Sequence, residues 1–198
     1  ALSYATNRWP QDFIRTFGIG YASNSWDSFS LWANDKGLDT DLLVELGLVK
    51  KKSMSNDVYD TFRGRIMIPV RDKQHRIIAF TARLLPDILA NDPNVPKYIN
   101  SSTSLIYDQG KSLFGIAGAW HATSKAGVMN LVEGAPDVMR LQVIGASNTV
   151  APLGSSWTEA QLSMLKRITS RLNIIPDSDI PKEGEHFGVG CASAMRTG

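Results

Sequence analysis

The last third of the sequence alternates strand-like and helix-like segments, and no other feature restricts the possible folds as strongly. Apolar runs typical of strands cover residues 127–134, 147–154 and 171–179. Helical spacing of apolar residues covers 136–145 and 157–169. A β-α-β-α-β order with short connections predicts a parallel sheet with right-handed crossovers.

The two predicted helices have clear end signals. Pro136 occupies the first position of the earlier helix, and Gly145 follows its last turn. In the later helix Thr158 is the predicted N-cap, and Gln161 completes a capping box. These signals leave only short connections to the strands, as the predicted parallel sheet requires.

Acidic residues follow the first and the third predicted strand. Glu133 ends the first strand, and Asp177 and Asp179 come directly after the third. Ligands of an open parallel sheet bind at the carboxyl ends of its strands, so the three carboxylates are predicted to converge. Such like charges repel unless a cation lies among them, and Mg²⁺ prefers oxygen ligands while keeping water for phosphates. The residues therefore predict a metal site for phosphoryl chemistry, although each motif alone also fits a turn or a helix cap.

The first two thirds of the sequence predict a mixed α+β region. Residues 10–50 show helical spacing interrupted by turns, and residues 65–83 predict a β-hairpin. Pro69 favours an edge or bulged position for the first strand of that hairpin. Residues 86–112, rich in Pro, Asn and Ser, predict a long ordered loop.

Basic residues gather over the predicted hairpin. Six lysines and arginines lie between Arg63 and Arg83 against one acid, Asp72, and the run 50–52 of three lysines precedes them. This distribution favours phosphate groups as partners, or else forms a solvated charged face, whereas the net charge of +2 decides nothing.

Composition restricts the class and the compartment. With 198 residues, 43% apolar and 20% charged, the chain predicts one large or two small globular domains. The single Cys191 excludes an internal disulfide and a Cys-rich zinc module, and it favours the reducing cytoplasm. The sequence shows neither a signal peptide nor an apolar run of membrane-spanning length. A start at Ala1 predicts that the chain is a piece of a longer protein.

Ordered motifs along the chain resemble the RNA polymerase core of bacterial DnaG-type primases. The segments VEGAPDVM, APLGSS and NIIPDSD resemble the Toprim domain, and FRGRIMIPVRDKQHRIIAFTAR and PKYINSSTSLIYDQGKSLFG precede them in the order seen in primases. The resemblance implies an α+β subdomain over 1–124 with a basic hairpin that binds nucleic acid. It implies a truncated Toprim-type parallel sheet over 125–198, so the fold class is α/β and α+β.

The resemblance also implies an activity and its partners. The activity is synthesis of short RNA primers from NTPs on a single-stranded DNA template, by metal-dependent nucleotidyl transfer. The 3′-hydroxyl of one ribonucleotide attacks the α-phosphate of the next, and metal ions stabilise the attacking and leaving oxygens. The implied partners are the DNA template, NTPs, the RNA primer and, through an absent C-terminal domain, a replicative helicase, with no membrane.

Individual residues receive roles from the same resemblance. Glu133, Asp177 and Asp179 would be catalytic, and with Asp137 they would hold Mg²⁺ or Mn²⁺, with no zinc in this part of the chain. Residues implied to bind template and nucleotide phosphates are Arg63, Arg65, Arg71, Arg83, Lys97, Tyr98, Asn100 and Lys111. Tyr98 fits a base-stacking role and a core or hydrogen-bonded role equally well. Side chains predicted for the core are Ile66, Ile68, Val70, Ile77 and Phe80.

The sequence departs from the primase pattern at several points. Ser178 stands between the two aspartates where glycine is usual, the S-P-E-T segment is replaced at 101–104, and Thr81-Ala82 precedes Arg83 in place of two glycines. A further family D-x-D falls beyond the end of the chain, so the fragment is expected to be weak or inactive alone. The alternatives are another Toprim enzyme, of topoisomerase or nuclease type, and a degenerate Toprim module that binds single-stranded DNA without chemistry.

Overall fold

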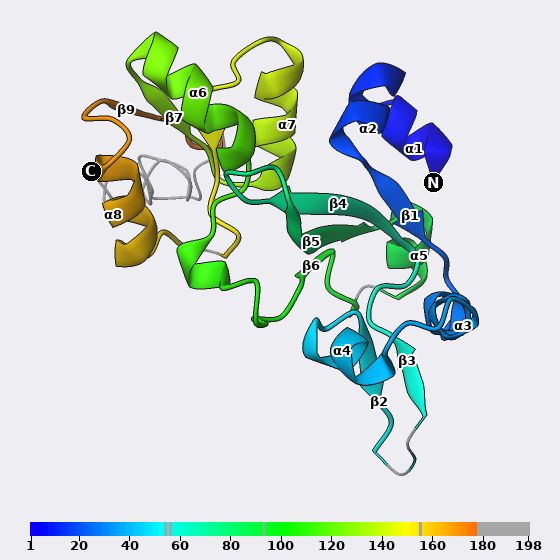
Figure 1. Cartoon of the computed structure of the whole chain (residues 1–198). Coiled ribbons are helices and arrows are strands. Elements are labelled where there is room, and N and C mark those ends of the chain that lie inside the picture. Colours follow the sequence, from blue (N-terminus) through cyan, green and yellow to red (C-terminus); the bar gives the residue numbers. More distant parts are fainter. Residues whose placement is uncertain (54, 56, 93, 155, 178–198) are drawn as a thin grey trace, which may run out of the picture. The chain divides into compact units, whose positions relative to one another are not determined.

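The computed structural model describes residues 1–53, 55, 57–92, 94–154 and 156–177 (Figure 1). Its contacts divide the chain into two compact units. The first unit contains Ala1–Val70 and Ile77–Asp108, and the second contains Arg71–Arg76 and the chain from Gln109 onward. The domain boundary predicted between residues 124 and 125 was placed from family motifs, whereas the two compact units are defined by contacts. That boundary therefore remains a prediction.

Strands of the first unit form one larger sheet and one small ribbon. The larger sheet has the order β1-β4-β5-β6, and the ribbon pairs β2 with β3. The strands are β1 Gly20–Ala22, β2 Val49–Lys51, β3 Val58–Asp60, β4 Arg65–Arg71, β5 Ile77–Leu84 and β6 Tyr98–Asn100. The helices of this unit are α1 Leu2–Thr6, α2 Gln11–Phe17, α3 Ser28–Asp35, α4 Thr40–Glu45 and α5 Pro86–Asn91.

The predicted hairpin over 65–83 is confirmed, but its first strand is not an edge strand. β4 lies between β1 and β5, so of the two positions that Pro69 favoured, edge or bulged, the edge position is wrong. The reason is the register, in which β1 pairs only with residues 65–67 of β4. Pro69 lies beyond that pairing, so its missing N–H removes no hydrogen bond to β1.

Two further predictions for the first unit need correction. Residues 86–112 do not form one long loop, because α5, β6 and the short 3-10 helix η1 (Gln109–Lys111) occupy parts of it. Ile77 was predicted for the core, yet 46% of it is exposed at the start of β5. Ile66, Ile68 and Val70 are buried as predicted, and Phe80 is half-buried.

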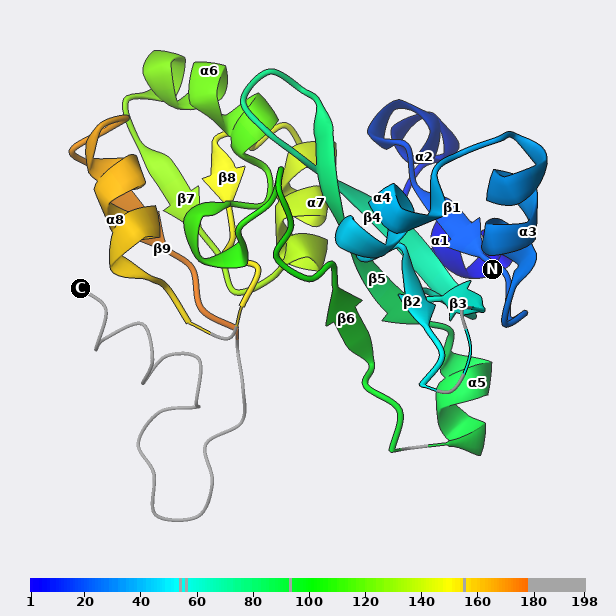
Figure 2. The same ribbon diagram turned by 60° about the horizontal axis from the view of Figure 1, so that its bottom comes forward.

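The β-α-β-α-β prediction for the second unit is confirmed (Figure 2). β7 is paired in parallel with β8 on one side and with β9 on the other. The elements are α6 Ile116–Ala126, β7 Met129–Leu131, α7 Ala135–Val143, β8 Thr149–Val150, α8 Glu159–Lys166 and β9 Leu172–Ile174. Since β8 and β9 both run parallel to β7, the carboxyl ends of all three strands lie at one edge of the sheet.

The capping box at the start of α8 is present as predicted. Thr158 Oγ1 accepts a hydrogen bond from the N–H of Gln161, and Gln161 Oε1 accepts one from the N–H of Thr158, each at 3.1 Å. Gln161, 1% exposed, also donates to the carbonyls of Gln109 and Ser112. The cap therefore fastens α8 to η1 as well as starting the helix.

The core of the second unit lies between α6, α8 and the sheet. Its buried side chains are Leu113, Ile116, Ala119, Met129, Leu131, Val150 and Leu165. Gly115, with a φ of 85°, permits a close approach here, because a Cβ at this position would meet Val138 Cγ1 at 2.6 Å and the Thr149 carbonyl at 2.7 Å. Within the described residues, no helix is both long and apolar enough to cross a membrane.

Candidate active site and nucleic-acid-binding residues

Glu133 and Asp177 meet at the carboxyl ends of two neighbouring strands. Leu131 of β7 lies opposite Ile174 of β9, and the N–H of Ile175 donates to the Leu131 carbonyl at 2.8 Å. Past this point, the backbone N–H of Asp177 donates to Glu133 Oε1 at 3.0 Å. Both acidic residues are exposed. The strand pairing thus brings together two carboxylates that are 44 residues apart in the chain.

Asp137 joins these two carboxylates from the first turn of α7. A Cβ at Gly134 would lie 3.4 Å from Asp137 Oδ2, so the carboxylate rests against the glycine backbone. Burial raises the pKa of Asp137, and the charges of Asp177 and Glu133 raise it further. Backbone N–H groups at Gly134 and Asp137 oppose this shift without cancelling it. The three acidic side chains therefore repel one another across one small region.

The donor chemistry of this region fits a hard divalent cation, since all its ligands are carboxylate oxygens and their mutual repulsion favours a positive ion. In the part of the chain that the structure describes, no three His, Cys, Asp or Glu side chains are already arranged to hold a metal ion. Asp179, predicted as a further ligand, and Ser178 lie outside the described residues.

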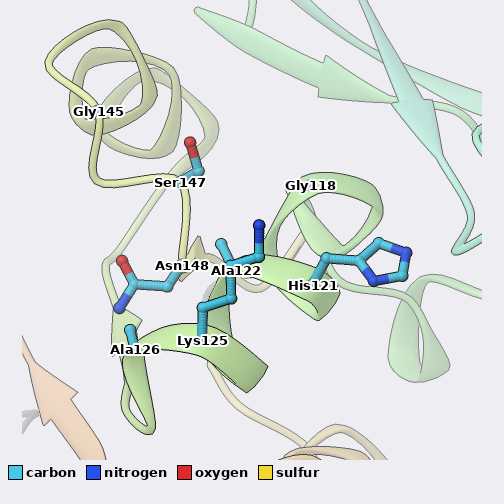
Figure 3. A pocket seen from close by; sticks show the side chains of 8 residues that line it. All are labelled: Gly118, His121, Ala122, Lys125, Ala126, Gly145, Ser147 and Asn148. Atoms are coloured by element: carbon cyan, nitrogen blue, oxygen red, sulfur yellow. The ribbon is translucent and has the colours of Figure 1, made fainter.

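A cavity of about 570 Å³ lies elsewhere in the second unit (Figure 3). α6 contributes His121 and Lys125 to its lining, and the loop after α7 contributes Ser147 and Asn148. Lys125 precedes β7 and Asn148 precedes β8, so the cavity is at the amino ends of the strands. It is therefore separate from the carboxylates at the carboxyl ends.

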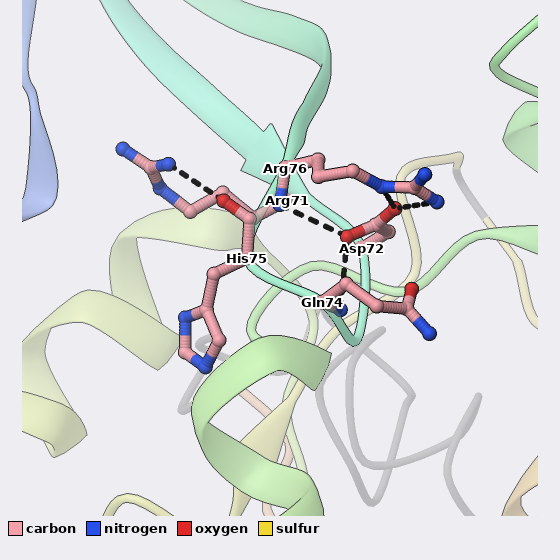
Figure 4. A network of polar contacts seen from close by, with 5 residues as sticks. All are labelled: Arg71, Asp72, Gln74, His75 and Arg76. Carbon is pink, nitrogen blue, oxygen red and sulfur yellow. Dashed lines mark hydrogen bonds and ion pairs between the residues drawn. The ribbon is translucent and has the colours of Figure 1, made fainter.

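Charged side chains at the tip of the β4–β5 hairpin interact with other groups of the same tip (Figure 4). Asp72 accepts hydrogen bonds from the N–H groups of Gln74 and Arg76, at 2.9 and 3.0 Å, and from Arg76 Nε at 2.7 Å. Burial alone would raise the pKa of Asp72, but these hydrogen bonds and the Arg76 charge outweigh it and lower the pKa. Arg71 Nη1 donates to the carbonyl of His75 at 2.9 Å. Arg71 and Arg76 are therefore both engaged within the tip.

Arg65, predicted to bind nucleic acid, is 4% exposed. Its guanidinium donates to the carbonyls of Pro96, at 2.9 Å, and Lys97, at 3.4 Å. Burial lowers the pKa of Arg65, and the nearby Arg63 charge lowers it further. Arg65 therefore holds the backbone that leads into β6, where Lys97 and Tyr98 follow.

Arg63 lies beside two aromatic rings, those of Trp26 and Tyr59. Its guanidinium carbon is 3.9 Å from the ring centroid of Trp26 and 5.5 Å from that of Tyr59, and it donates to the Asp60 carbonyl. Trp26 is 63% exposed. Lys50 lies opposite Tyr59 in the β2–β3 ribbon, so both side chains project from the same face. Sequence reasoning missed Trp26 and Tyr59, because only the tertiary fold places them beside Arg63.

Arg83 and Tyr98 form a pair across β5 and β6. The two residues are direct partners in the antiparallel register, and Arg83 Nη1 donates to Tyr98 Oη at 2.6 Å. The hydrogen-bonded role considered for Tyr98 is therefore present. Asn100, opposite Thr81, projects from the same face two residues further on.

The remaining predicted basic residues differ in their location. Lys97 is exposed immediately before β6, in the first unit. Lys111 is exposed at the end of η1, in the second unit, and the half-buried Arg71 at the hairpin tip belongs to the same unit. Of the predicted basic and polar set, only Arg71 and Lys111 thus share a compact unit with the carboxylates.

Known proteins match this chain along most of its length. Residues 1–120 match the family described as DNA primase catalytic core, N-terminal domain. The DNA primase of Haemophilus influenzae is 34% identical over 168 residues, which are 85% of this chain and 27% of that protein. Such curated relatives are covered over 24% to 28% of their own length.

Solved primase structures share the fold. The zinc-binding and RNA polymerase domains of the Aquifex aeolicus primase match with a TM-score of 0.84 and 29% identity, over 100% of this chain and 45% of that one. A DnaG primase catalytic domain bound to ssDNA matches with a TM-score of 0.78 and 29% identity, over 98% of this chain and 56% of that one.

Proposed function

Because this chain belongs to the DNA primase catalytic core family, we propose that it supplies the nucleotidyl-transfer site and part of the DNA-binding surface of a primase. The observation that carries the proposal is the meeting of Glu133 and Asp177 at adjacent strand ends, with Asp137 beside them. The product is a short RNA made from NTPs on a single-stranded DNA template.

Glu133, Asp137 and Asp177, together with Asp179, would hold Mg²⁺ or Mn²⁺ at this edge of the sheet. When bound, such an ion neutralises the carboxylates and the negative charge that develops on the transferring phosphoryl group.

Two side-chain roles follow from the protein alone. Glu133 Oε1 is fixed by the N–H of Asp177, so Oε2 is left to accept the proton of the attacking 3′-hydroxyl or to bind the cation. Asp137, half-buried beside Glu133 and Asp177, would add its charge to the negative field that attracts the cation. The catalysis proposed is positioning and electrostatic stabilisation, without a covalent protein intermediate.

The first unit is proposed to bind the DNA strand. Lys97 is exposed, and Arg83, Tyr98 and Asn100 lie on one face of the sheet, where they can contact phosphates. The exposed Trp26, backed by Arg63, offers a ring on which a base can stack. Arg65 acts as a positioning residue for Lys97 and Tyr98 rather than as a contact. A solved relative, a DnaG primase catalytic domain bound to ssDNA, supports DNA binding by this fold.

The test is template-directed incorporation of ribonucleotides on single-stranded DNA, with Mg²⁺ and with Mn²⁺, by this chain extended through the next D-x-D of the primase pattern. Glu133→Gln is expected to reduce incorporation by about 10³-fold or more, because one proton-accepting and cation-binding oxygen is lost. Glu159→Gln, an exposed first-turn acid of α8, is the matched control and should behave as the parent. DNA binding without incorporation in the parent would favour instead a DNA-binding module without chemistry.

A further inference from the structure

The first unit contains a cavity of about 410 Å³ that the proposed function does not use. Strand β1, the start of α3, β4 and β5 contribute to its lining, together with Asp60 at the end of β3. Small-molecule sites in proteins usually have volumes of about 300–1,000 Å³, so the cavity is large enough to be one. All of its described lining residues belong to the first unit, and the cavity is therefore a feature of that unit alone.

Three phenylalanine rings form part of the inner wall of the cavity. Phe62 is 6% exposed, and its ring meets that of Phe80 edge to face, with the ring centroids 6.3 Å apart. Phe29 is half-buried, and its ring stacks on that of Trp32 at a centroid distance of 5.9 Å. The half-buried Met67 adds a flexible side chain that can adapt to the shape of a ligand. Such a wall suits the faces and edges of a planar aromatic molecule.

Two serine hydroxyls lie at the exposed side of the cavity. Ser23 and Ser28 are both exposed lining residues, and their Oγ atoms are joined by a hydrogen bond of 2.6 Å. Because one of these hydroxyls donates to the other, the accepting hydroxyl keeps its own proton for a further acceptor. The serine pair can therefore donate one hydrogen bond to a ligand atom at the mouth of the cavity.

Asp60 determines which charge a ligand of this cavity can carry. Its side chain is 3% exposed, and its two carboxylate oxygens accept from the N–H groups of Phe29 and Ser30, at 2.7 and 2.9 Å. Among the described lining residues Asp60 is the one acidic side chain, and none is basic. A buried carboxylate without a basic side chain in the same wall repels a second anion. The cavity therefore disfavours phosphates and carboxylates, unlike the basic residues proposed to bind DNA.

We infer that the cavity is a binding site for a small, neutral and planar aromatic molecule that carries one hydrogen-bond acceptor. The rings of Phe29, Phe62 and Phe80 bury the flat part of this ligand, and the serine pair binds its acceptor at the mouth. The site is independent of the proposed function, because none of its described lining residues belongs to the carboxylate region or to the residues proposed to bind DNA.

Methyl NMR of the full chain with isotope-labelled methionine tests the site directly. The probe is quinoline, a neutral molecule of two fused rings with one accepting nitrogen, and Met67→Leu identifies the Met67 signal. We expect this signal to shift saturably, with a Kd of about 0.1–1 mM for so small a ligand. The signals of Met129 and Met139, which are buried in the second unit, should not shift. An unchanged Met67 signal in millimolar quinoline would overturn the inference and leave the proposed function unaffected.

Naphthalene tests the hydroxyl contact, because it has the shape of quinoline and no accepting atom. In the double variant Ser23→Ala/Ser28→Ala, binding of quinoline should weaken by about two- to tenfold, whereas binding of naphthalene should not change. Ser55→Ala removes an exposed hydroxyl that donates to Asp57 outside the cavity, and it should bind both molecules as the parent does. Equal changes for quinoline and naphthalene in the double variant would overturn the role of the serine pair.

Ala22→Leu tests the location by placing a larger side chain in the cavity from β1. The variant should bind neither quinoline nor naphthalene, because the added atoms occupy the space of the ligand. Undiminished binding by the folded variant would show that the ligand lies elsewhere. The serine variants change exposed positions, so they decide the question even if Ala22→Leu does not fold.

Oligo(dT) distinguishes a free small molecule from a base of the DNA strand. The shift of the Met67 signal in quinoline should persist in excess oligo(dT), because Asp60 disfavours the phosphates that a strand would bring with its bases. Loss of the shift would assign the cavity to a base of the strand and would overturn a separate small-molecule site.

Discussion

The two units treat their charged side chains in opposite ways. In the second unit Glu133, Asp137 and Asp177 crowd together, and no ion pair of the described residues includes them. In the first unit Arg65 is satisfied by two backbone carbonyls and Arg63 by aromatic rings and a carbonyl. The three carboxylates are thus available to an external cation, whereas Arg63 and Arg65 already interact with groups of the protein itself.

The structure therefore distinguishes charged residues that are paired within the fold from charged residues that are left without a protein partner. A sequence motif alone does not distinguish the two kinds. Removing a charge that belongs to the fold should destabilise the protein, because its partners stay buried and unpaired. Removing one of several mutually repelling charges should stabilise the protein and impair only binding or chemistry. The predictions below test this contrast.

Arg65→Met should have the largest effect on stability. The substitution leaves the carbonyls of Pro96 and Lys97 without their guanidinium donors, and a hydrogen bond to a charged group contributes about 1.5–3 kcal/mol. We expect the free energy of unfolding, measured in urea, to fall by about 2–3 kcal/mol. Lys97→Met, at an exposed position, should change it by less than about 0.5 kcal/mol. Similar values for the two variants would show that Arg65 is not part of the fold.

Asp137→Asn should act in the opposite direction and by less. Burial and the charges of Asp177 and Glu133 raise the pKa of Asp137, so ionising this carboxyl costs more free energy in the folded protein than in the unfolded chain. With metal removed by a chelator, the variant should raise Tm by about 1–2 °C, although an acid in the first turn of a helix normally stabilises it.

Glu159→Gln provides the matched comparison, because Glu159 is also in a first helical turn but has no carboxylate neighbours in the site. It should leave Tm unchanged or lower it slightly. A lower Tm for Asp137→Asn would mean that the helix N-terminus outweighs the repulsion, and the contrast between the units would fail.

Removing the Tyr107 hydroxyl should have the smallest effect on stability near neutral pH and a measurable effect at alkaline pH. The side chain is 2% exposed, and burial, with a smaller contribution from the Asp108 charge, raises its pKa from 10.0 to about 12. The folded protein keeps the neutral phenol between these values while the unfolded chain ionises. Stability from this group is therefore complete below pH 10 and is lost as pH rises to about 12.

The check compares the parent with Tyr107→Phe by phenolate absorbance and by Tm across this alkaline range. The Phe variant should lose less stability between pH 10 and about 12, because it has no hydroxyl to ionise. Identical alkaline profiles for the two proteins would show that Tyr107 is not protected in the folded state.

Sequence reasoning succeeded where local signals and sheet geometry suffice. The capping box at Thr158, Pro136 in the first turn of α7 and the β-α-β-α-β succession of the second unit depend on neighbours in the chain. The meeting of Glu133 and Asp177 follows from the rule that parallel strands end at one edge. These features could be predicted because each is short in range or common to all such sheets.

The first unit was harder to predict because its elements are short and depend on distant partners. β6 has three residues and pairs with β5 only in the tertiary fold. The sequence therefore predicted a loop at these residues. The start of α3 is capped by Asp60, which accepts from the N–H groups of Phe29 and Ser30 across about thirty residues. Likewise, nothing in the local sequence distinguishes the buried Arg65 from an exposed arginine.

The most direct test of the central claim is a calorimetric titration of this chain with Mn²⁺, beside Glu133→Gln and Asp177→Asn. We predict that the parent binds the ion and that each variant weakens binding by about tenfold or more, while Glu159→Gln binds as the parent does. That result would place the carboxylates at the ends of β7 and β9 in one cation site. Unchanged binding in both variants would contradict it.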